Sequence, residues 1–409
     1  MIAACRSCRG PLVRTFLDLG DTPLANSYVD EDRLGQAEAR FPLHARVCDQ
    51  CLLVQLDHSV PPEDIFTDYA YFSSYSDAWV EHARRFADAA VERFGLGPAS
   101  LVVEIASNDG YLLKHFQDHA VPVLGVEPAA NVAEVAIGQG IPTEVCFFGQ
   151  NTARRLVGER GHADLLVGNN VLAHVPDLDD FTGGLAIALA SDGVISIEVP
   201  HLLRLIQHVE FDTIYHEHFS YFSLLAAERA FGRNGLRVFD VEELPTHGGS
   251  LRLFACHVDD PRSEGEGLRR VRQAEADAGL DRIAAYEGFA AKVERCRRSV
   301  RDFLGSVRAE GGRVAAYGAA AKGNTLLNFC GVTASDIDFV VDRNPHKQGR
   351  YLPGSHIPID KPDRVRAEQP DYLLILPWNL RDEVMAQMAD IRTWGGKFVI
   401  PIPEVAVVE

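Results

Sequence analysis

The sequence predicts an α/β protein in three parts: a small N-terminal zinc module followed by two Rossmann-like domains. Three observations predict this architecture. Two Cys-x-x-Cys pairs lie within the first 51 residues, short apolar runs alternate with helical stretches after residue 100, and the same alternation returns after residue 310. Alternating strands and helices form parallel, doubly wound sheets. The length of 409 residues exceeds what one hydrophobic core usually serves, so several domains are expected.

The composition excludes several classes of protein. The 46% hydrophobic and 24% charged content is that of an ordinary globular chain. A formal net charge of -18 argues against a nucleic-acid partner, although a local basic pocket could still hold a phosphorylated small molecule. No apolar run is long enough to span a bilayer, and the N-terminus lacks the apolar core of a signal peptide. We therefore expect a cytoplasmic protein without a membrane partner; the sequence leaves the oligomeric state open, and a monomer is one possibility.

The first part, to about residue 70, carries the paired cysteines Cys5, Cys8, Cys48 and Cys51. Each Cys-x-x-Cys pair can form a tight knuckle, and two knuckles close a tetrahedral thiolate site for Zn2+. Four protein ligands leave no open position, so this zinc would be structural and would supply folding energy to a module with little core. The alternative is a set of redox-active pairs or disulfides.

The second part contains four apolar runs that we interpret as parallel strands, at residues 101–105, 121–128, 163–170 and 193–200. They follow a helical stretch at 79–95. Ligands of such sheets bind at the carboxyl ends of the strands. The candidate cofactor residues follow these ends: Glu104, Ala106, Asn108 and Gly110 around the first turn, Glu127 after the second strand, and Asn169 and Asn170 after the third.

The chemistry of these residues favours a nucleoside cofactor without a pyrophosphate. An acidic residue at the end of the second strand commonly binds ribose hydroxyls. Only Gly110 remains of a glycine-rich turn, whereas a dinucleotide would favour a fuller glycine pattern. A nucleoside cofactor such as S-adenosylmethionine is therefore expected. The alternative is an ordinary Rossmann-type sheet with solvated polar loops.

The third part follows a charged helical region at about 262–310 and again has a strand, a turn and a helix, in "RVAAYGAAAKGNTLLNF". Asp342 ends the next strand, and an acidic residue at this distance after the turn is typical of a dinucleotide site. Basic side chains near the turn instead favour the diphosphate of a nucleotide. The candidate substrate residues are Lys322, Asn324, Arg343, Lys347 and Arg350. The alternative is a basic loop on an acidic protein.

Taken together, several segments resemble a known family. These are "EIASNDGYLLKHF", "VEPAANVA", "NNVLAHVPDLDDF", "YHEHFSYFS", "HGGSLR" and "YGAAAKGNTLLN", in this order. Over its whole length the chain resembles the S-adenosylmethionine-dependent C-methyltransferases that act on nucleotide-linked 4-keto deoxysugars in antibiotic biosynthesis, and most of all the sugar 3-C-methyltransferases. The resemblance implies a zinc module at 1–70, a methyltransferase domain at 71–260 and a C-terminal domain at 261–409 that helps to hold a dTDP-linked 4-keto deoxysugar.

The resemblance also implies catalytic residues. His218 would be the base, with Tyr69, Tyr215, Glu217 and His174 lining the same pocket; Tyr71 and Tyr75 are alternatives to Tyr69. A C4 ketone acidifies the proton at C3, so a base can form an enolate that attacks the sulfonium methyl group. Histidine suits this role because its ordinary pKa lies near neutrality. His247 and Arg252 are further candidate substrate contacts, and the alternative for Arg252 is an ion pair with a surface carboxylate.

The stretch "YHEHFSYF" (215–222) raises a structural question, because in a regular strand Tyr215 and Glu217 would face away from His218. If all three meet one substrate, the backbone here must be an irregular loop, with His218 inward and His216 turned elsewhere. Alternative functions are C5 methylation of a related sugar, a nicotinamide-dependent nucleotide-sugar oxidoreductase, or a non-catalytic zinc-containing scaffold.

Overall fold

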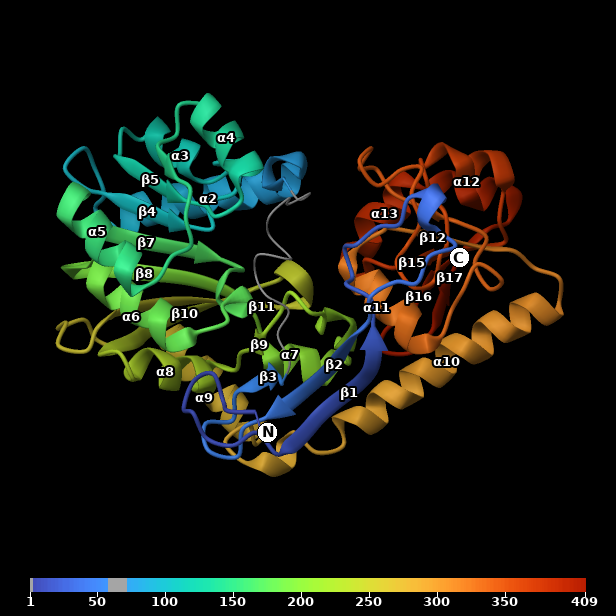
Figure 1. The fold of residues 1–409 in the computed structure, drawn as a ribbon, viewed down its shortest axis with the longest axis horizontal. Helices are drawn as coiled ribbons and strands as arrows, with labels where there is room; N and C mark the ends of the chain where they lie inside the picture. Colours follow the sequence, from blue (N-terminus) through green and yellow to red (C-terminus); the bar gives the residue numbers. More distant parts are fainter. Residues whose placement is uncertain (1–2, 58–71) are drawn as a thin grey trace.

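The computed structural model describes residues 3–57 and 72–409, and these residues form three sheets. Figure 1 shows the central and C-terminal sheets in separate lobes, with strands β1 and β2 between and below them. The sheet architecture confirms the α/β fold class predicted from the sequence.

The central sheet has seven strands in the order β10-β11-β8-β7-β4-β5-β6. The strands from β8 to β6 are parallel, and β11 and β10 add an antiparallel edge. The four apolar runs expected as strands are confirmed as β4, β5, β7 and β8, and their burial on both faces explains their nearly continuous hydrophobicity. The bounds are β4 Val102–Ile105, β5 Val123–Val126, β6 Thr143–Glu144, β7 Ala163–Asn169, β8 Leu189–Pro200, β10 Leu236–Leu244 and β11 Ser250–His257.

Helices pack around this sheet, and the first is the helical stretch expected near residue 79. Helix α2 (Asp77–Phe94) begins where the Ser76 hydroxyl accepts the Trp79 amide and ends at Gly95 in a left-handed conformation. Its buried face includes Ala83 and Phe86. The other helices of this lobe are α3 Leu113–Asp118, α4 Ala130–Gly138, α5 Gln150–Arg160, α6 Leu178–Ala188, α7 Leu202–His208, α8 Leu224–Gly232 and α9 Glu266–Asp277.

The C-terminal sheet has six strands in the order β14-β13-β12-β15-β16-β17, all parallel except β17. Its bounds are β12 Val314–Tyr317, β13 Val340–Val341, β14 Ile359–Asp360, β15 Tyr372–Ile375, β16 Lys397–Ile400 and β17 Ala406–Val408. Its helices are α10 Phe289–Ala309, α11 Ala321–Cys330, α12 Asp363–Glu368 and α13 Arg381–Gln387. None of the helices in the described ranges is long and apolar enough to cross a membrane.

The third sheet joins the N-terminal module to the central lobe. Strands β1 (Arg14–Thr22), β2 (Phe41–Val47) and β3 (Val54–Leu56) are followed in it by β9 (Ser220–Tyr221), which lies within the "YHEHFSYF" stretch. Strands β3 and β9 are antiparallel, with Gln55 opposite Ser220. The zinc module is therefore built into the backbone of the motif that carries His218.

One hydrophobic cluster spans all three parts of the chain. It contains Phe16 of the N-terminal module, Phe211 beside helix α7, and Phe289 and Leu326 of the C-terminal part. Phe16 and Phe289 stack with their ring centres 4.7 Å apart. Because separating the parts would expose this apolar surface to water, the cluster fixes the lobes against each other.

Candidate active site

The four paired cysteines come together at the start of the chain. All four sulfur atoms lie within 4.8 Å of one another, with Cys5 Sγ 3.4 Å from Cys51 Sγ and Cys8 Sγ 3.5 Å from Cys48 Sγ. A tetrahedral zinc ion with bonds of about 2.3 Å places its ligand sulfurs about 3.8 Å apart. The cluster therefore fits Zn2+, and its four thiolates would complete the coordination shell of a structural ion. None of the four is in a disulfide.

Gln55 connects this cluster to the candidate catalytic motif. Its side-chain nitrogen donates to Cys5 Sγ over 3.1 Å, and its side-chain oxygen accepts the Arg6 amide over 2.8 Å. Gln55 is fully buried and lies opposite Ser220 in the sheet. A change in the zinc site can thus reach the motif through Gln55, and also through Arg6, whose guanidinium lies over the Phe219 ring.

The segment from Tyr215 to His218 is a turn rather than a strand, because the His218 amide donates to the Tyr215 carbonyl over 2.9 Å. The turn brings Tyr215 and His218 to the same side. His216 points away, and its Nε2 donates to the Phe41 carbonyl over 3.2 Å. The irregular backbone predicted for this stretch is confirmed, and so is the separation of the two histidines.

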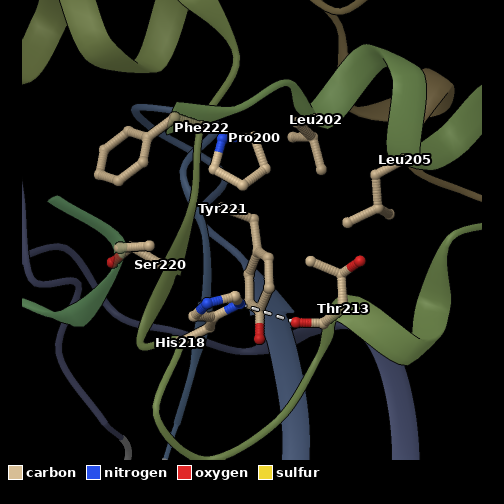
Figure 2. Close-up of a pocket in the computed structure, with 9 residues that line it drawn as sticks. Pro200, Leu202, Leu205, Thr213, His218, Ser220, Tyr221 and Phe222 are labelled. Atoms are coloured by element: carbon tan, nitrogen blue, oxygen red, sulfur yellow. Dashed lines mark hydrogen bonds between the residues drawn. The ribbon is translucent and has the colours of Figure 1, made fainter. Parts of the chain in front are cut away.

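The hydrogen bonds of His218 fix its tautomer. Its Nδ1 lies 2.9 Å from the Thr213 carbonyl oxygen (Figure 2), and its Nε2 lies 2.8 Å from the Tyr215 hydroxyl. Since a carbonyl oxygen only accepts, Nδ1 carries the proton, and Nε2 keeps a lone pair that accepts from Tyr215. Burial, and then the neighbouring His174, hold the pKa of His218 well below its ordinary value. The ring is therefore neutral, with a basic nitrogen at Nε2.

Of two other residues expected in the pocket, His174 lies beside His218, whereas the Glu217 side chain is held by Asn26. The His174 ring contacts the His218 ring edge-on with centres 4.8 Å apart, and burial lowers the His174 pKa to about 4. Glu217 is buried, which raises its pKa to about 7, and its Oε1 accepts from Asn26 Nδ2 over 2.6 Å. Tyr69 lies outside the described residues.

A small cavity adjoins His218 and explains why the ring stays neutral. Figure 2 shows it between the His218–Thr213 pair and a wall of apolar side chains. Its lining residues are Ala173, Pro200, Leu202, Leu205, Thr213, His218, Ser220, Tyr221 and Phe222. An apolar wall keeps water from the imidazole and so disfavours its charged form.

The turn after β4 has the strained backbone expected of a ligand cradle. Ala106, Asn108 and Gly110 have φ angles of 56°, 50° and 80°, a region that most side chains avoid. A Cβ at Gly110 would overlap Ile141 Cδ1. The Glu127 carboxylate holds the turn by accepting the Asn108 amide over 2.9 Å and the Ala129 amide over 2.8 Å.

The carboxyl ends of β4 and β7 add polar atoms that fit S-adenosylmethionine. Burial raises the pKa of Glu104 well above its ordinary value, and Asn169 Nδ2 donates to the Tyr111 hydroxyl over 3.2 Å. The Oδ1 atoms of Asn169 and Asn170 are buried and have no hydrogen-bond partner among the described residues. Two free amide oxygens beside a cradle and a buried acid suit a ligand that carries an amine, an adenine and ribose hydroxyls.

Three of the candidate substrate residues lie where the lobes meet. Lys322 Nζ donates to the His247 carbonyl over 3.2 Å and lies 5.0 Å from the centre of the Trp378 ring. His247 Nε2 is 3.3 Å from Asn170 Nδ2 at the cofactor edge. Asn324 is buried and donates to the Ala25 carbonyl over 2.6 Å. Lys322 and His247 therefore connect the C-terminal domain to the carboxyl end of β7.

The remaining four candidates have protein partners of their own, some outside the pocket. Lys347 Nζ donates to the Ala319 carbonyl over 2.8 Å, which closes the turn before α11. Arg350 pairs with Asp30 over 2.8 Å, and the exposed Arg343 lies 3.8 Å from Glu383. Arg252 is buried in the central lobe against Glu198, with an N···O distance of 2.9 Å. We therefore expect Arg252 to stabilise the fold rather than to touch substrate.

Sequence reasoning missed three residues of this region: Asn26, Asp212 and Trp378. Asn26 holds Glu217, Asp212 precedes the Thr213 carbonyl that orients His218, and Trp378 Nε1 donates to Asp212 Oδ2 over 2.7 Å. The one signal in the sequence is that Trp378 follows a strand of the C-terminal sheet, at the edge where ligands gather. Nothing local to Asn26 indicates its partner.

Three family models match three successive ranges of the chain. A C-methyltransferase C-terminal domain matches residues 245–403, a methyltransferase domain matches 79–241, and a domain described as zinc-binding matches 5–66. The C-methyltransferase NovU of Streptomyces niveus is 38% identical over 408 residues, covering 100% of this chain and 97% of the relative.

Among solved structures, the magnesium protoporphyrin IX methyltransferase of Synechocystis is 15% identical, with a TM-score of 0.32. The match covers 47% of this chain and 87% of that one. An S-adenosylmethionine-dependent methyltransferase of Anabaena variabilis is 16% identical over 44% of this chain and 94% of its own, with a TM-score of 0.33.

Proposed function

The chain belongs to the S-adenosylmethionine-dependent C-methyltransferase family, and from this premise we propose that it methylates C3 of a dTDP-linked 4-keto deoxysugar. S-adenosylmethionine, when bound, supplies an electrophilic methyl group on a sulfonium sulfur. The protein must then turn a sugar carbon into a nucleophile. That requires a neutral, positioned base and a donor for the oxygen on which negative charge develops.

The neutral tautomer of His218 is the observation that carries the proposal. Its Nδ1–H is held by the Thr213 carbonyl, and its Nε2 lone pair faces the Tyr215 hydroxyl. Because burial holds the pKa of His218 low, the ring is unprotonated in the free enzyme and its Nε2 lone pair is not already occupied by a proton. In the proposed reaction, Nε2 takes the C3 proton and the electrons of that C–H bond move to the oxygen on C4.

Tyr215 is proposed to donate a hydrogen bond to the oxygen on which the negative charge develops. Its hydroxyl bonds His218 Nε2 over 2.8 Å in the free enzyme. When the substrate C3–H occupies the position next to Nε2, the hydroxyl would turn toward the C4 oxygen. The enolate carbon then forms the new bond to the methyl group, and the thioether leaves as a neutral product. The imidazolium that results keeps its Nδ1–H bond to Thr213, which spreads the positive charge onto a carbonyl dipole.

The diphosphate of the substrate is proposed to bind where the lobes meet. Lys322 is close to the amino end of α11, and both its ammonium group and the helix dipole favour an anion. The Lys322 contact with the His247 carbonyl places this charge beside the cofactor edge. This arrangement supports a long substrate with a charged linker between its base and its sugar.

The family assignment bears differently on the three alternative functions. A C4 ketone acidifies C5–H as well as C3–H, so methylation at C5 of a related sugar is the second candidate and uses the same base. The family assignment favours methyl transfer over a nicotinamide-dependent oxidoreductase or a non-catalytic scaffold.

The test is mass spectrometry of a panel of dTDP-linked 4-keto deoxysugars incubated with the enzyme and labelled S-adenosylmethionine. We expect a gain of one methyl group, with NMR placing it on C3. His218→Ala should abolish the gain while cofactor binding is retained, and His216→Ala is the matched control because His216 points to Phe41. A fully active His218→Ala enzyme would contradict the assignment of His218 as the base.

A further inference from the structure

A series of contacts runs from the C-terminal domain to the base. Trp378 follows β15 in the C-terminal sheet, and its indole N–H donates to Asp212 Oδ2 over 2.7 Å. Asp212 precedes Thr213, and both belong to one turn of 3-10 helix at Phe211–Thr213. The Thr213 carbonyl in turn accepts the Nδ1–H of His218 over 2.9 Å. Two hydrogen bonds and one peptide link therefore separate the indole from the imidazole.

The C-terminal domain holds this helical turn at two points. Phe211 packs edge-on against Phe329 of α11, with ring centres 5.4 Å apart, and Asp212 is bound by Trp378. A turn of three residues has little rigidity of its own, since its few internal hydrogen bonds leave most of its backbone groups to outside partners. Its position, and with it the direction of the Thr213 carbonyl, is therefore set from outside.

Asp212 depends on the indole because it has few other partners. The side chain is completely buried, and its Oδ1 has no hydrogen-bond partner among the described residues. The nearby charge of Lys322 also favours the Asp212 carboxylate, but removing the indole N–H leaves the buried Oδ2 without its side-chain donor, which is costly and would drive Asp212 and its neighbour to move. Lys322 lies over the Trp378 ring, 5.0 Å from its centre, so the side chain provides an aromatic contact to this ammonium group as well as a donor to Asp212.

We propose that Trp378 is a positioning residue of the active site: by holding Asp212 it fixes the Thr213 carbonyl, which keeps the proton of His218 on Nδ1 and the lone pair on Nε2. The proposal rests on the proposed function, in which Nε2 is the base. It assigns the C-terminal domain a part in proton transfer in addition to substrate binding. The base would reach its active form only when the two lobes are assembled.

Trp378→Phe tests the proposal because it removes the N–H and keeps an aromatic ring under Lys322. We expect kcat to fall about 10-fold to 100-fold, the effect of losing a hydrogen bond to a buried carboxyl group, while KM changes less than about twofold. Trp394→Phe is the matched control. Its indole N–H donates to the Pro370 carbonyl in the same domain, so this variant should keep the wild-type kcat.

A spectroscopic measurement separates positioning from general damage. In 15N-histidine NMR spectra of the full-length enzyme without substrate, His218, assigned by comparison with His218→Ala, should show a protonated Nδ1 and an unprotonated Nε2. We expect Trp378→Phe to shift these signals toward a mixture of tautomers and Trp394→Phe to leave them unchanged. Unchanged His218 signals in a folded Trp378→Phe variant would overturn the proposal.

A double-mutant cycle with Asp212→Ala provides a second criterion. If both residues act through one hydrogen bond, the double variant should lose no more kcat than Asp212→Ala alone. Fully multiplicative losses would contradict the proposal. Failure of the proposed function would look different: His218→Ala would then stay active, while the tautomer of His218 would still respond to Trp378→Phe.

Discussion

Gly110→Ala should damage both the stability of the protein and its affinity for S-adenosylmethionine. Gly110 has a φ of 80°, and an added Cβ would overlap Ile141 Cδ1 and lie 3.3 Å from Ala136 Cβ. The left-handed conformation costs alanine about 1–2 kcal/mol, and overpacking adds about 1–3 kcal/mol. We therefore expect the free energy of unfolding to fall by about 2–4 kcal/mol, after a small gain from the stiffer unfolded chain.

The two contributions can be separated in one experiment. Ile141→Val removes the methyl group that the new Cβ would overlap. Adding it to Gly110→Ala should therefore restore the unfolding free energy lost to overpacking and leave the loss caused by the left-handed backbone conformation. Gly158→Ala in α5 is the matched control. Nothing lies within 4 Å of a Cβ there, so it should stabilise the helix by about 0.5–1 kcal/mol.

Urea unfolding gives the stabilities, and calorimetry gives the dissociation constant of S-adenosylmethionine. We expect the affinity of Gly110→Ala to fall at least about tenfold, because the turn must shift to relieve the overlap. If Gly110→Ala lowered the free energy of unfolding by less than about 0.5 kcal/mol and left the affinity for S-adenosylmethionine unchanged, the turn would be neither strained nor part of the cofactor site.

Three further predictions follow from the site. Removal of zinc by a chelator, or Cys48→Ser, should unfold the N-terminal module and abolish activity through Gln55 and β9, whereas Cys146→Ser should not; circular dichroism and the methyl-transfer assay measure both. Because burial raises the Glu217 pKa to about 7 from 4.5, the native state binds this proton more tightly than the unfolded state, so this group lowers stability as pH rises from about 4.5 to 7. Glu217→Gln should remove that slope and be up to about 3 kcal/mol more stable at pH 8, as measured by urea unfolding; equal stability there would contradict the shift. Tyr215→Phe removes the donor to Nε2 and should lower kcat about 100-fold in steady-state assays with stability nearly unchanged.

Local patterns in the sequence account for the strands and for the zinc cluster. The runs at 101–105 and 163–170 are strongly apolar because both faces of a parallel strand are covered, and this signal needs no knowledge of the partner strand. The cysteine pairs carry their chemistry in their spacing. The existence of these strands and the identity of the zinc ligands were therefore predictable, although β5 and β8 begin at residues 123 and 189 rather than 121 and 193, and the short strand β6 was not expected.

The rest of the site depends on contacts between distant segments, which one sequence does not encode in any local pattern. Asn26 reaches Glu217, and Trp378 reaches Asp212, across the boundaries between the three parts. Strand β9 is two residues long and exists because β3 lies beside it. Arg252 was a candidate for contact with substrate or with a surface carboxylate, yet its partner Glu198 is buried and comes from the neighbouring strand β8. Tertiary packing decides such pairings.

Hydrogen exchange at the sugar tests the central claim most directly. A dTDP-linked 4-keto deoxysugar is incubated with the enzyme in D2O without S-adenosylmethionine, and deuterium at C3 and C5 is read by NMR. The account predicts deuterium at C3 with the wild-type enzyme and His216→Ala, and none above background with His218→Ala. Exchange at C5 alone would show that the enzyme deprotonates C5, on the other side of the carbonyl, rather than C3. Undiminished exchange by His218→Ala would contradict the assignment of His218 as the base.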